Sequence, residues 1–487
     1  MGMFSRFSLR TFYNKLLYIH KDERLKVFLL SLSFFCVIGT YTVVRTLKDS
    51  LFTSIVGGKE SLAVAKLWSM ILLIPAILLF SKLVDTMRRS HLLTLYSLIY
   101  GIGGLVIGYY LTHPTIGLAN TQQNVDRIFG WIIYFFLDGF NPFVVSLFWS
   151  FTHSITSPGS AKGNYPIMVA ASKLGGVVAT TCACWWLNRL DAATGKQLLS
   201  DAANHQVLFF ATSFLLLMVP LFIALMIMLV PSRALHGYEA AYKFEKQHAR
   251  EEKAEGRESW WTALKKNFEG IILMARYPYV MGILGVVSFW EIVNVFVNLD
   301  RVTMIGQVSL TISQKTSSLL YHDFWVHTVG FIVTLIGTRA IIEYLGERRS
   351  LLLVPCVTAV LIIYYLTAQM VTSQAAAVSI AIAYVLLKAL NYAFASPLRE
   401  SLYIPTTKSV KFKSKSWIDS FGTKFAKSIG AFYNGLAFSS AANGLFFSAI
   451  IGLWILVAHL LGRRYEAAIA HGEVIGSDEE NQGNGKE

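Results

Sequence analysis

Charged residues are scarce in this sequence. Asp, Glu, Lys and Arg make up 15% of its 487 residues, whereas a soluble globular protein carries about a quarter. The four cysteines all lie in apolar stretches with no cluster of metal ligands around them, which excludes a zinc ribbon. Neither a Gly-Lys-Ser/Thr phosphate loop nor a His-Glu-x-x-His motif occurs, which excludes a primary ATP-driven pump and gives no sign of an intramembrane enzyme. We therefore expect no enzymatic activity, no metal and no cofactor.

What the sequence does contain is long apolar stretches. Hydrophobic residues make up 54% of the chain and the mean hydropathy is +0.51. A stretch of about 20 apolar residues crosses a bilayer as a helix, because lipid offers the backbone no other hydrogen-bond partner. The sequence thus predicts an all-α membrane protein with twelve transmembrane helices. The expected spans are 26–47, 62–84, 92–111, 129–151, 167–187, 207–230, 279–297, 323–345, 351–371, 376–397, 418–439 and 443–462.

The basic residues are distributed unevenly among the loops. Most Lys and Arg fall in alternate loops, and the loops 112–128 and 371–375 hold almost none. Because basic residues collect on the cytoplasmic side of a membrane, this alternation predicts that both termini face the cytoplasm. It also accounts for the formal charge of +14 without a nucleic-acid partner. The partner that we expect for the protein surface is the lipid bilayer.

The loop 231–270 is the only extended hydrophilic stretch inside the chain, and it divides the spans into six and six. The predicted organisation has five parts. They are an N-terminal cytoplasmic amphipathic segment (1–25), a six-helix bundle (26–230), a cytoplasmic linker (231–270), a second six-helix bundle (271–465) and a disordered tail (466–487).

The two halves resemble each other at an offset of about 250 residues. The segment 138–141 in the fourth span corresponds to 388–391 in the tenth, and 172–175 corresponds to 427–430. Such duplication is typical of transporters built from two pseudo-symmetric bundles. We expect alternating access, with a binding site near the membrane midplane between the bundles.

Two loops also match each other, after the second and the eighth spans. Each has an acidic residue at the cytoplasmic end of the span, followed by paired arginines. This pattern is similar to the loop motif of the major facilitator transporters, and we interpret its charges as gating or structural salt bridges. The predicted gating residues are Asp85, Arg88, Arg89, Glu343, Arg348 and Arg349.

Several ionisable side chains fall within the predicted spans. Such residues are costly in a bilayer, so a functional role is the first hypothesis. The predicted substrate-binding residues are Lys48, Arg45, Lys173, Glu291, Lys388, Lys427 and Asp138. Cations outnumber carboxylates in this set, which favours an anionic, phosphate-bearing substrate. The carboxylates would pair with the cations in the empty protein, titrate with a coupled proton, or bind a ribose hydroxyl.

These charged positions stand within motifs that resemble the ATP/ADP translocase (nucleotide transporter, TLC-type) family of plastids and obligate intracellular bacteria. The motifs are Arg45-Thr-Leu-Lys48-Asp49, Ser146-Leu-Phe-Trp149, Leu402-Tyr-Ile-Pro405, the segment 411–419 and Ala426-Lys427-Ser428-Ile-Gly430. The resemblance runs across nearly all of the predicted spans. It implies a major-facilitator-like fold and nucleotide import, commonly by exchange of external ATP for internal ADP.

The resemblance also implies roles for four charged positions. Lys48, Glu291 and Lys427 match charged residues that the family needs for transport, and Asp138 fits the span-four glutamate with a shift of one residue. Thr152 and His153 stand where the family usually has Ala-Asn. These departures keep open proton-coupled symport of nucleoside triphosphates and exchange of another nucleotide. A non-transporting receptor or scaffold is a remote alternative, because the external loops are short. We expect a monomer in the inner membrane of a bacterial cell, with a small-molecule nucleotide (ATP, ADP or a related one) as its substrate.

Overall fold

The structure is a computed structural model that describes residues 23–156, 158–190, 197–231, 235, 272, 274–336, 345–407, 414–436 and 438–476. The amphipathic segment 1–25 up to residue 22, nearly all of the linker 231–270 and the end of the tail from residue 477 lie outside these residues. Within the described residues, ten helices are long and apolar enough to cross a membrane. The predicted all-α membrane fold is confirmed, while the count of twelve spans stays a prediction.

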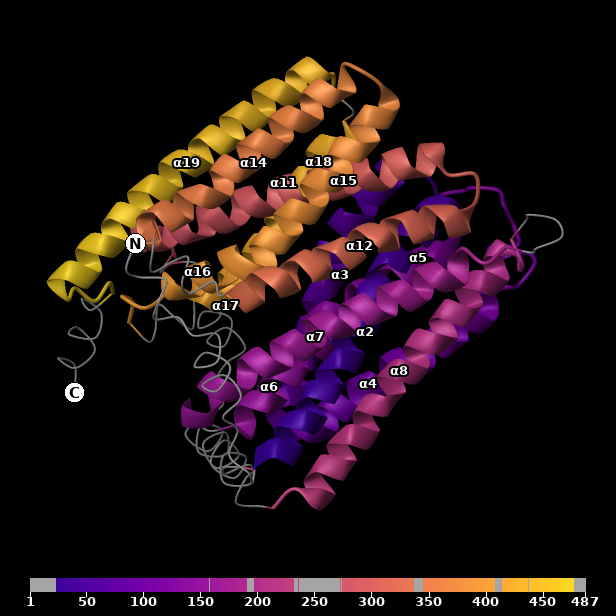
Figure 1. Ribbon diagram of the computed structural model, residues 1–487, viewed down its shortest axis with the longest axis horizontal. Helices are drawn as coiled ribbons and strands as arrows, with labels where there is room; N and C mark the ends of the chain where they lie inside the picture. The colour runs from indigo at the N-terminus through magenta and orange to yellow at the C-terminus, as the bar shows by residue number, and fades with distance from the viewer. Residues whose placement is uncertain are drawn as a thin grey trace. The chain divides into compact units, whose positions relative to one another are not determined.

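The chain folds into two compact units, and Figure 1 labels their helices. Unit 1 takes described residues from 1–57, 71–255 and 309–328. Its helices are α2 (Arg24–Ile55), α4 (Arg89–Leu111), α5 (Ile128–Asp138), the π-helix η3 (Asn141–Val145), α6 (Ser146–Ser154), α7 (Pro158–Leu187) and α8 (Asp201–Leu229). It also includes the later part of α3 (Lys59–Thr86) and the first part of α12 (Ile312–Ile336).

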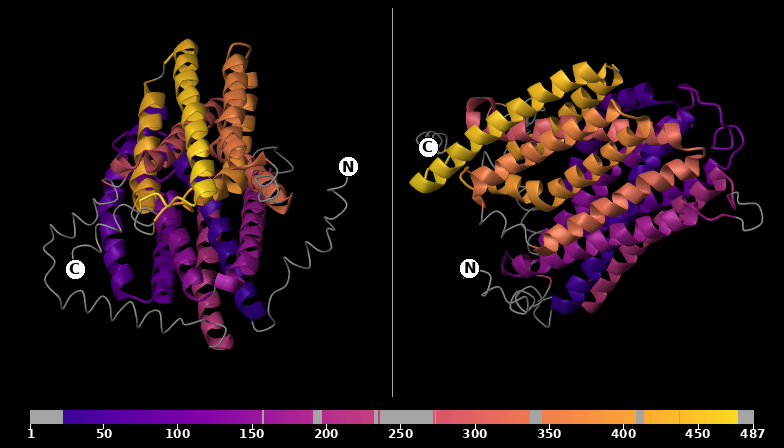
Figure 2. Two further views of the ribbon diagram at one scale, coloured as in Figure 1. Left: turned by 90° about the vertical axis from the view of Figure 1, so that its left-hand side faces the viewer. Right: turned by 45° about the horizontal axis from the view of Figure 1, so that its top comes forward.

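Unit 2 takes described residues from 58–70, 256–308 and 329–487. Its helices are α11 (Pro278–Val308), α14 (Glu347–Gln369), α15 (Ser373–Leu390), the π-helix η5 (Asn391–Ala395), α16 (Ser396–Ser401), α17 (Lys415–Trp417), the π-helix η7 (Ile418–Gly422), α18 (Thr423–Gly435) and α19 (Ser440–His471). The first part of α3 and the last part of α12 also belong to this unit. Helix α19 runs alongside α14, as both figures show (Figures 1 and 2).

Burial separates the central helices from the peripheral ones. The most apolar windows of α2 and α11 are 72% and 56% buried, whereas those of α8 and α19 are only 33% and 28% buried. The exposed surface of the peripheral helices is apolar, as at Phe214, Met228 and Leu453. A helix whose outer surface is apolar is suited to lipid, where the backbone bonds internally and side chains need no water. The chain is therefore a multi-pass membrane protein.

The positions that match in the sequence also match in the structure. A Cβ on Gly175 of α7 would lie 2.3 Å from the carbonyl oxygen of Phe35 in α2, and one on Gly430 of α18 would lie 2.7 Å from that of Ile292 in α11. A glycine thus allows the central helix of each unit to approach a neighbour closely. The π-helices η3 and η5 begin at Asn141 and Asn391, the two asparagines that the repeat aligns.

Several predicted span boundaries differ from the helices. The seventh span was expected to end at residue 297, but α11 continues to Val308; the eighth was expected to begin at 323, but α12 begins at Ile312. Both extensions carry polar residues that are buried by neighbouring helices, such as Asp300 and Ser313. Hydropathy reports contact with lipid, so it underestimates a helix that packs polar groups against protein. Helix α19 likewise continues to His471, into the segment 466–487.

Candidate substrate-binding site

Lys48 and Asp138 form the closest charged contact of the central helix α2. Lys48 Nζ donates to Asp138 Oδ1 at 2.6 Å, and the Asp49 carboxylate lies 3.8 Å from the same nitrogen. The ammonium also lies 4.6 Å from the centre of the Tyr134 ring. The Lys48 residue is only 6% exposed. The Lys48 ammonium therefore interacts with two carboxylates and with the face of an aromatic ring.

Asp138 lies where the fourth span changes its winding. Helix α5 ends at Asp138, and the π-helix η3 follows from Asn141 with Pro142 near its start. Proline has no N–H to donate to the carbonyl four residues earlier, which here belongs to Asp138, so the regular α-helical ladder cannot continue. π-helical turns are frequent at functional sites because they re-aim side chains. The sequence motif around Asp138 thus has a local structural effect as well as a charge.

Arg45 lies one turn before Lys48 on α2 and pairs with a different carboxylate. Its Nη2 donates to Asp323 Oδ1 at 2.7 Å, and Thr46 Oγ1 donates to Asp323 Oδ2 at 2.5 Å. Asp323 is fully buried, and Arg45 also lies 5.7 Å from the Tyr41 ring. Arg45 is therefore paired with Asp323.

Glu291 and Lys427 lie together in unit 2. Lys427 Nζ on α18 is 3.6 Å from Glu291 Oε1 on α11, and Asn294 Nδ2 donates to Glu291 Oε2 at 2.9 Å. The Lys427 side chain is 37% exposed, whereas that of Glu291 is 14% exposed. The distance exceeds that of a direct hydrogen bond, so the two charges attract without a tight contact. Lys427 is therefore the more solvent-accessible member of the pair, and Glu291 is largely covered.

Lys388 and Lys173 occupy the other two predicted positions. Lys388 Nζ lies 5.8 Å from the ring centres of both Tyr384 and Tyr392, within range of a cation–π interaction. Lys173 is partly exposed on α7, two residues from the close approach of Gly175 to α2. The structure thus brings Lys48 to Asp138 and Lys427 to Glu291, while Lys388 has an aromatic setting.

The predicted gating residues are only partly described. Glu343 and the Asp85 side chain lie outside the described parts. Arg88 and Arg89 stand at the start of α4, and Arg349 is exposed. Arg348 Nη2 lies 3.1 Å from His459 Nε2 of α19, next to the tight position of Gly462. The gating role of these residues stays a prediction.

Lys59, Asp300 and Asp323 are among the charged residues that the sequence reasoning did not identify. Asp300 and Asp323 are 6% and 0% exposed, and each accepts several hydrogen bonds. Both carboxylates lie in or at the edge of helix segments that the predicted spans cut short. In the sequence, each of these two carboxylates is an acidic residue within one helical turn of an apolar stretch, with no turn-forming residue nearby. This pattern could have identified them.

This architecture, with two helical units that share repeated positions and hold charges in their central helices, is a major-facilitator-like fold. Solved structures agree at the level of the fold. The E. coli xylose transporter XylE in its inward-open conformation matches with a TM-score of 0.56 at 12% identity, covering 92% of this chain and 95% of that one. The nucleoside transporter NupG matches with a TM-score of 0.57 at 12% identity, covering 91% and 100%.

The family follows from the sequence comparisons. The model of the TLC ATP/ADP transporter family matches residues 5–465, so the chain belongs to this family. Curated relatives include ADP,ATP carrier protein 1 of Chlamydia pneumoniae, 24% identical over 94% of this chain and 95% of the relative. ADP,ATP carrier protein 3 of Rickettsia conorii is 23% identical over 89% of this chain and 91% of the relative. The family resemblance found in the sequence is confirmed, and the relatives are carriers rather than enzymes.

Proposed function

We propose that this chain imports nucleotides by exchanging external ATP for internal ADP through alternating access. The observation that carries the proposal is the presence, in each unit, of a lysine beside a carboxylate: Lys48 with Asp138 and Lys427 with Glu291. The relatives' names, ADP,ATP carrier proteins, support the choice of substrate.

The chemistry of these pairs suits a polyphosphate that enters and leaves. A buried lysine without a counter-charge is costly, so a carboxylate partner stabilises the protein when no substrate is bound. Phosphate oxygens form charge-assisted hydrogen bonds with the same ammonium groups. Substrate phosphates would therefore replace the carboxylates as partners of Lys48. At Lys427 they would bind in addition to Glu291. Exchange requires in addition that the empty carrier reorients less readily than the loaded one.

The location that we propose is the inner membrane of a bacterial cell, with both termini in the cytoplasm. The distribution of Lys and Arg among the loops supports this orientation. The protein would act as a monomer surrounded by lipid, with no nucleic-acid partner.

The direct test is uptake of labelled ATP by proteoliposomes that contain the purified protein. Vesicles preloaded with ADP are compared with empty vesicles and with vesicles under an imposed pH gradient. Exchange predicts uptake that depends on internal ADP and persists when a protonophore removes the gradient. Uptake that needs the gradient and no internal nucleotide would replace exchange with proton symport.

Two variants connect the test to the site. Lys427→Gln should abolish ATP uptake while the protein still inserts and purifies normally. Arg463→Gln removes a cation from the exposed surface of α19 and should transport as the unchanged protein does. Normal uptake by the Lys427→Gln protein would remove unit 2's lysine from the proposed mechanism.

A further inference from the structure

Helices α3 and α12 are each divided between the two units. Residues 58–70, with the start of α3, group with unit 2, although the later part of this helix belongs to unit 1. Residues 309–328, with the start of α12, group with unit 1, although the end of α12 belongs to unit 2. Polar contacts hold each of these two helix starts in place.

The start of α12 is held on α2 by a series of polar contacts. Lys315 Nζ donates to Thr53 Oγ1 at 2.5 Å, and the hydroxyls of Thr316 and Ser50 lie 2.6 Å apart. These four side chains are buried. The contacts pair positions near the end of α2 with the first turns of α12. We call this series, with its continuation at Asp323, the α2–α12 seam.

The seam continues two turns further along α12. Asp323 accepts from Arg45 at 2.7 Å and from Thr46 at 2.5 Å, and His327 Nε2 lies 2.9 Å from Thr42 Oγ1. His327 and Asp323 are four residues apart, as are Thr42 and Thr46, so each helix presents a polar stripe to the other. The seam thus has a hydrogen bond or an ion pair at Thr316, Asp323 and His327, while the buried Leu319 and Leu320 lie between the first two of these levels.

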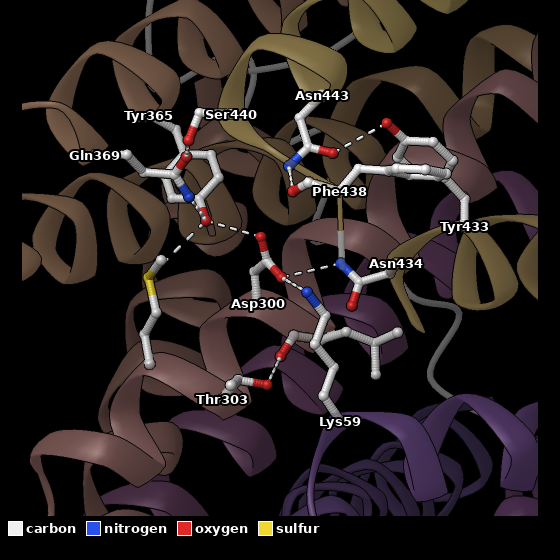
Figure 3. A network of polar contacts seen from close by, with 12 residues as sticks. Lys59, Asp300, Thr303, Tyr365, Gln369, Tyr433, Asn434, Phe438, Ser440 and Asn443 are labelled. Atoms are coloured by element: carbon white, nitrogen blue, oxygen red, sulfur yellow. Dashed lines mark hydrogen bonds and ion pairs between the residues drawn. The ribbon is translucent and has the colours of Figure 1, made fainter. Parts of the chain in front are cut away.

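Unit 2 holds the start of α3 in a comparable way, around Asp300 of α11 (Figure 3). Lys59 Nζ, in the first turn of α3, lies 3.0 Å from Asp300 Oδ1, and Asn434 Nδ2 donates to the same oxygen at 2.9 Å. Tyr365 donates to Asp300 Oδ2 at 2.8 Å and itself accepts from Gln369. Asp300 is the centre of this network, and Lys59 is the member that α3 contributes.

The two arrangements are reciprocal. In the order of the expected spans, the second span (α3) is held on the seventh (α11), and the eighth (α12) is held on the first (α2). Two halves related by a pseudo-two-fold axis would exchange these contacts. In both cases a buried carboxylate and a cation come from different helices, and the helix that is held starts with a lysine in its first turns. The duplication has therefore kept the role while changing the residues.

These contacts differ in kind from the permanent helix packing of each unit. Helices α2 and α7 approach each other closely at Gly175, and α11 and α18 do so at Gly430. Separation of these helices would expose apolar surface to water. Separation of the α2–α12 seam or of the Lys59–Asp300 contact instead exposes charges and hydroxyls that water can satisfy. Because a hydrogen bond between such groups is only modestly better than one to water, these contacts can open and close at low net cost.

We propose that Asp300 and Asp323 are positioning residues of the transport cycle, which hold the first parts of α3 and α12 in one access state and release them in the other. The end of α2 near Ile55 is the outer end in the topology proposed above, so the contacts would close the outer side. This inference rests on the proposed alternating access and not on the identity of the nucleotide.

The test uses a cysteine reporter in the seam, in protein whose four native cysteines (Cys36, Cys182, Cys184 and Cys356) are replaced by serine. Ser50→Cys places a thiol at a fully buried position of the seam. Spheroplasts that express this protein are treated with a membrane-impermeant maleimide, and the labelling rate reports how often the seam is open to the outside. Asp323→Asn removes the charge with little change in shape.

We expect the labelling rate to rise at least about 10-fold in Asp323→Asn, a change that corresponds to ~1.4 kcal/mol. The affinity of the purified protein for ATP should stay within about 2-fold, while the exchange rate falls. Asp323→Glu, which keeps the charge, should recover part of the slow labelling. Asp300→Asn and Lys59→Gln should raise labelling at a cysteine replacing Thr303, which lies beside Asp300 (Figure 3).

Unchanged labelling in both carboxylate variants would overturn the proposal, and so would a parallel loss of ATP affinity, which would make Asp323 a substrate-site residue. If Asp323→Asn does not insert, Thr46→Val removes the hydrogen bond that Thr46 donates to Asp323 and must raise the labelling rate. Labelling needs no transported nucleotide. If ATP/ADP exchange fails in liposomes while the labelling result holds, the proposed substrate is wrong and the inference about the two carboxylates stands.

Discussion

Lys48 and Asp138 are joined by a 2.6 Å contact across 90 residues of sequence. The pair connects α2, the most buried helix of unit 1, to the last residue of α5, where the span changes to π-helical winding. Asp49 and the Tyr134 ring complete the surroundings of the ammonium. A charge in this position is stabilised only while its partners are present, which leads to the first prediction.

Removal of one member of the pair should destabilise the protein, and removal of both should be less harmful. Breaking a buried ion pair leaves an uncompensated charge and costs about 3–5 kcal/mol. We therefore expect Lys48→Ala to lower the melting temperature in detergent more than Asp138→Ala does, because Asp138 and Asp49 both lose their cation in the former, whereas Lys48 keeps Asp49 in the latter. The double variant Lys48→Ala/Asp138→Ala should recover much of the stability but should not transport. Additive losses of melting temperature in the double variant would mean that the two side chains act independently.

The lysine and glutamate of unit 2 should behave differently. Lys427 is 37% exposed and 3.6 Å from Glu291, so screening by solvent keeps the contribution of the pair to stability below about 1 kcal/mol. We expect Lys427→Gln and Glu291→Gln to melt within a few degrees of the unchanged protein and to lose at least about 100-fold in ATP exchange. The paired measurements are thermal unfolding and counterflow from the same preparation. A large drop in melting temperature with residual exchange would assign the pair to structure.

The sequence was sufficient for the fold class and for the charges at the centre of the spans. Lys48, Glu291 and Lys427 could be singled out because charged residues in apolar stretches are rare and costly. Their role in substrate binding stays a prediction. The aligned glycines and asparagines of the two halves also marked real structural positions, the close helix approaches and the starts of the π-helices.

The carboxylates that pair with the arginine and lysine residues were harder to predict from the sequence. Asp323 lies at the predicted start of a span whose helix begins at Ile312, and Asp300 lies beyond the predicted end of another. Hydropathy averages over a window and responds to lipid contact, so it cannot recognise a helix end whose polar groups are satisfied by a neighbouring helix. The choice of Asp323 for Arg45 and of Asp138 for Lys48 depends on tertiary packing that no local pattern specifies.

Glu23 gives a prediction about pH at the start of α2. Its carboxylate accepts from Lys26 at 2.8 Å and from Asn164 at 3.2 Å, and Lys26 also donates to the carbonyl of Ile155 at 3.2 Å. Burial alone would raise the pKa of Glu23, but the hydrogen bonds and the Lys26 charge outweigh it and lower the pKa from 4.5 to about 2. A lowered pKa means that the contact contributes its full stability above pH 4.5 and loses it as the pH falls towards 2.

The matching experiment compares the unchanged protein with Glu23→Gln in thermal unfolding from pH 7 to pH 3. We expect the variant to melt at a lower temperature at pH 7, and the difference between the two proteins to shrink below pH 4.5. The difference is the informative quantity, because other carboxylates titrate in both proteins. A difference that is constant over this range would contradict the lowered pKa.

The glycine approaches make a prediction about packing that separates the permanent contacts from the proposed gate. Gly175→Ala places a methyl group 2.3 Å from the Phe35 carbonyl oxygen, and Gly430→Ala places one 2.7 Å from that of Ile292. Both neighbours are backbone atoms that cannot rotate away, so helices α7 and α18 must shift, at a cost of about 1–3 kcal/mol. Gly452→Ala, with open space around the new methyl group, is the matched control and should be neutral or slightly stabilising, since alanine favours helix. In thermal unfolding, Gly175→Ala should have the lowest melting temperature, Gly430→Ala an intermediate one and Gly452→Ala the highest. Equal melting temperatures would mean that these helices tolerate displacement. They would then not be the fixed framework against which the α2–α12 seam opens.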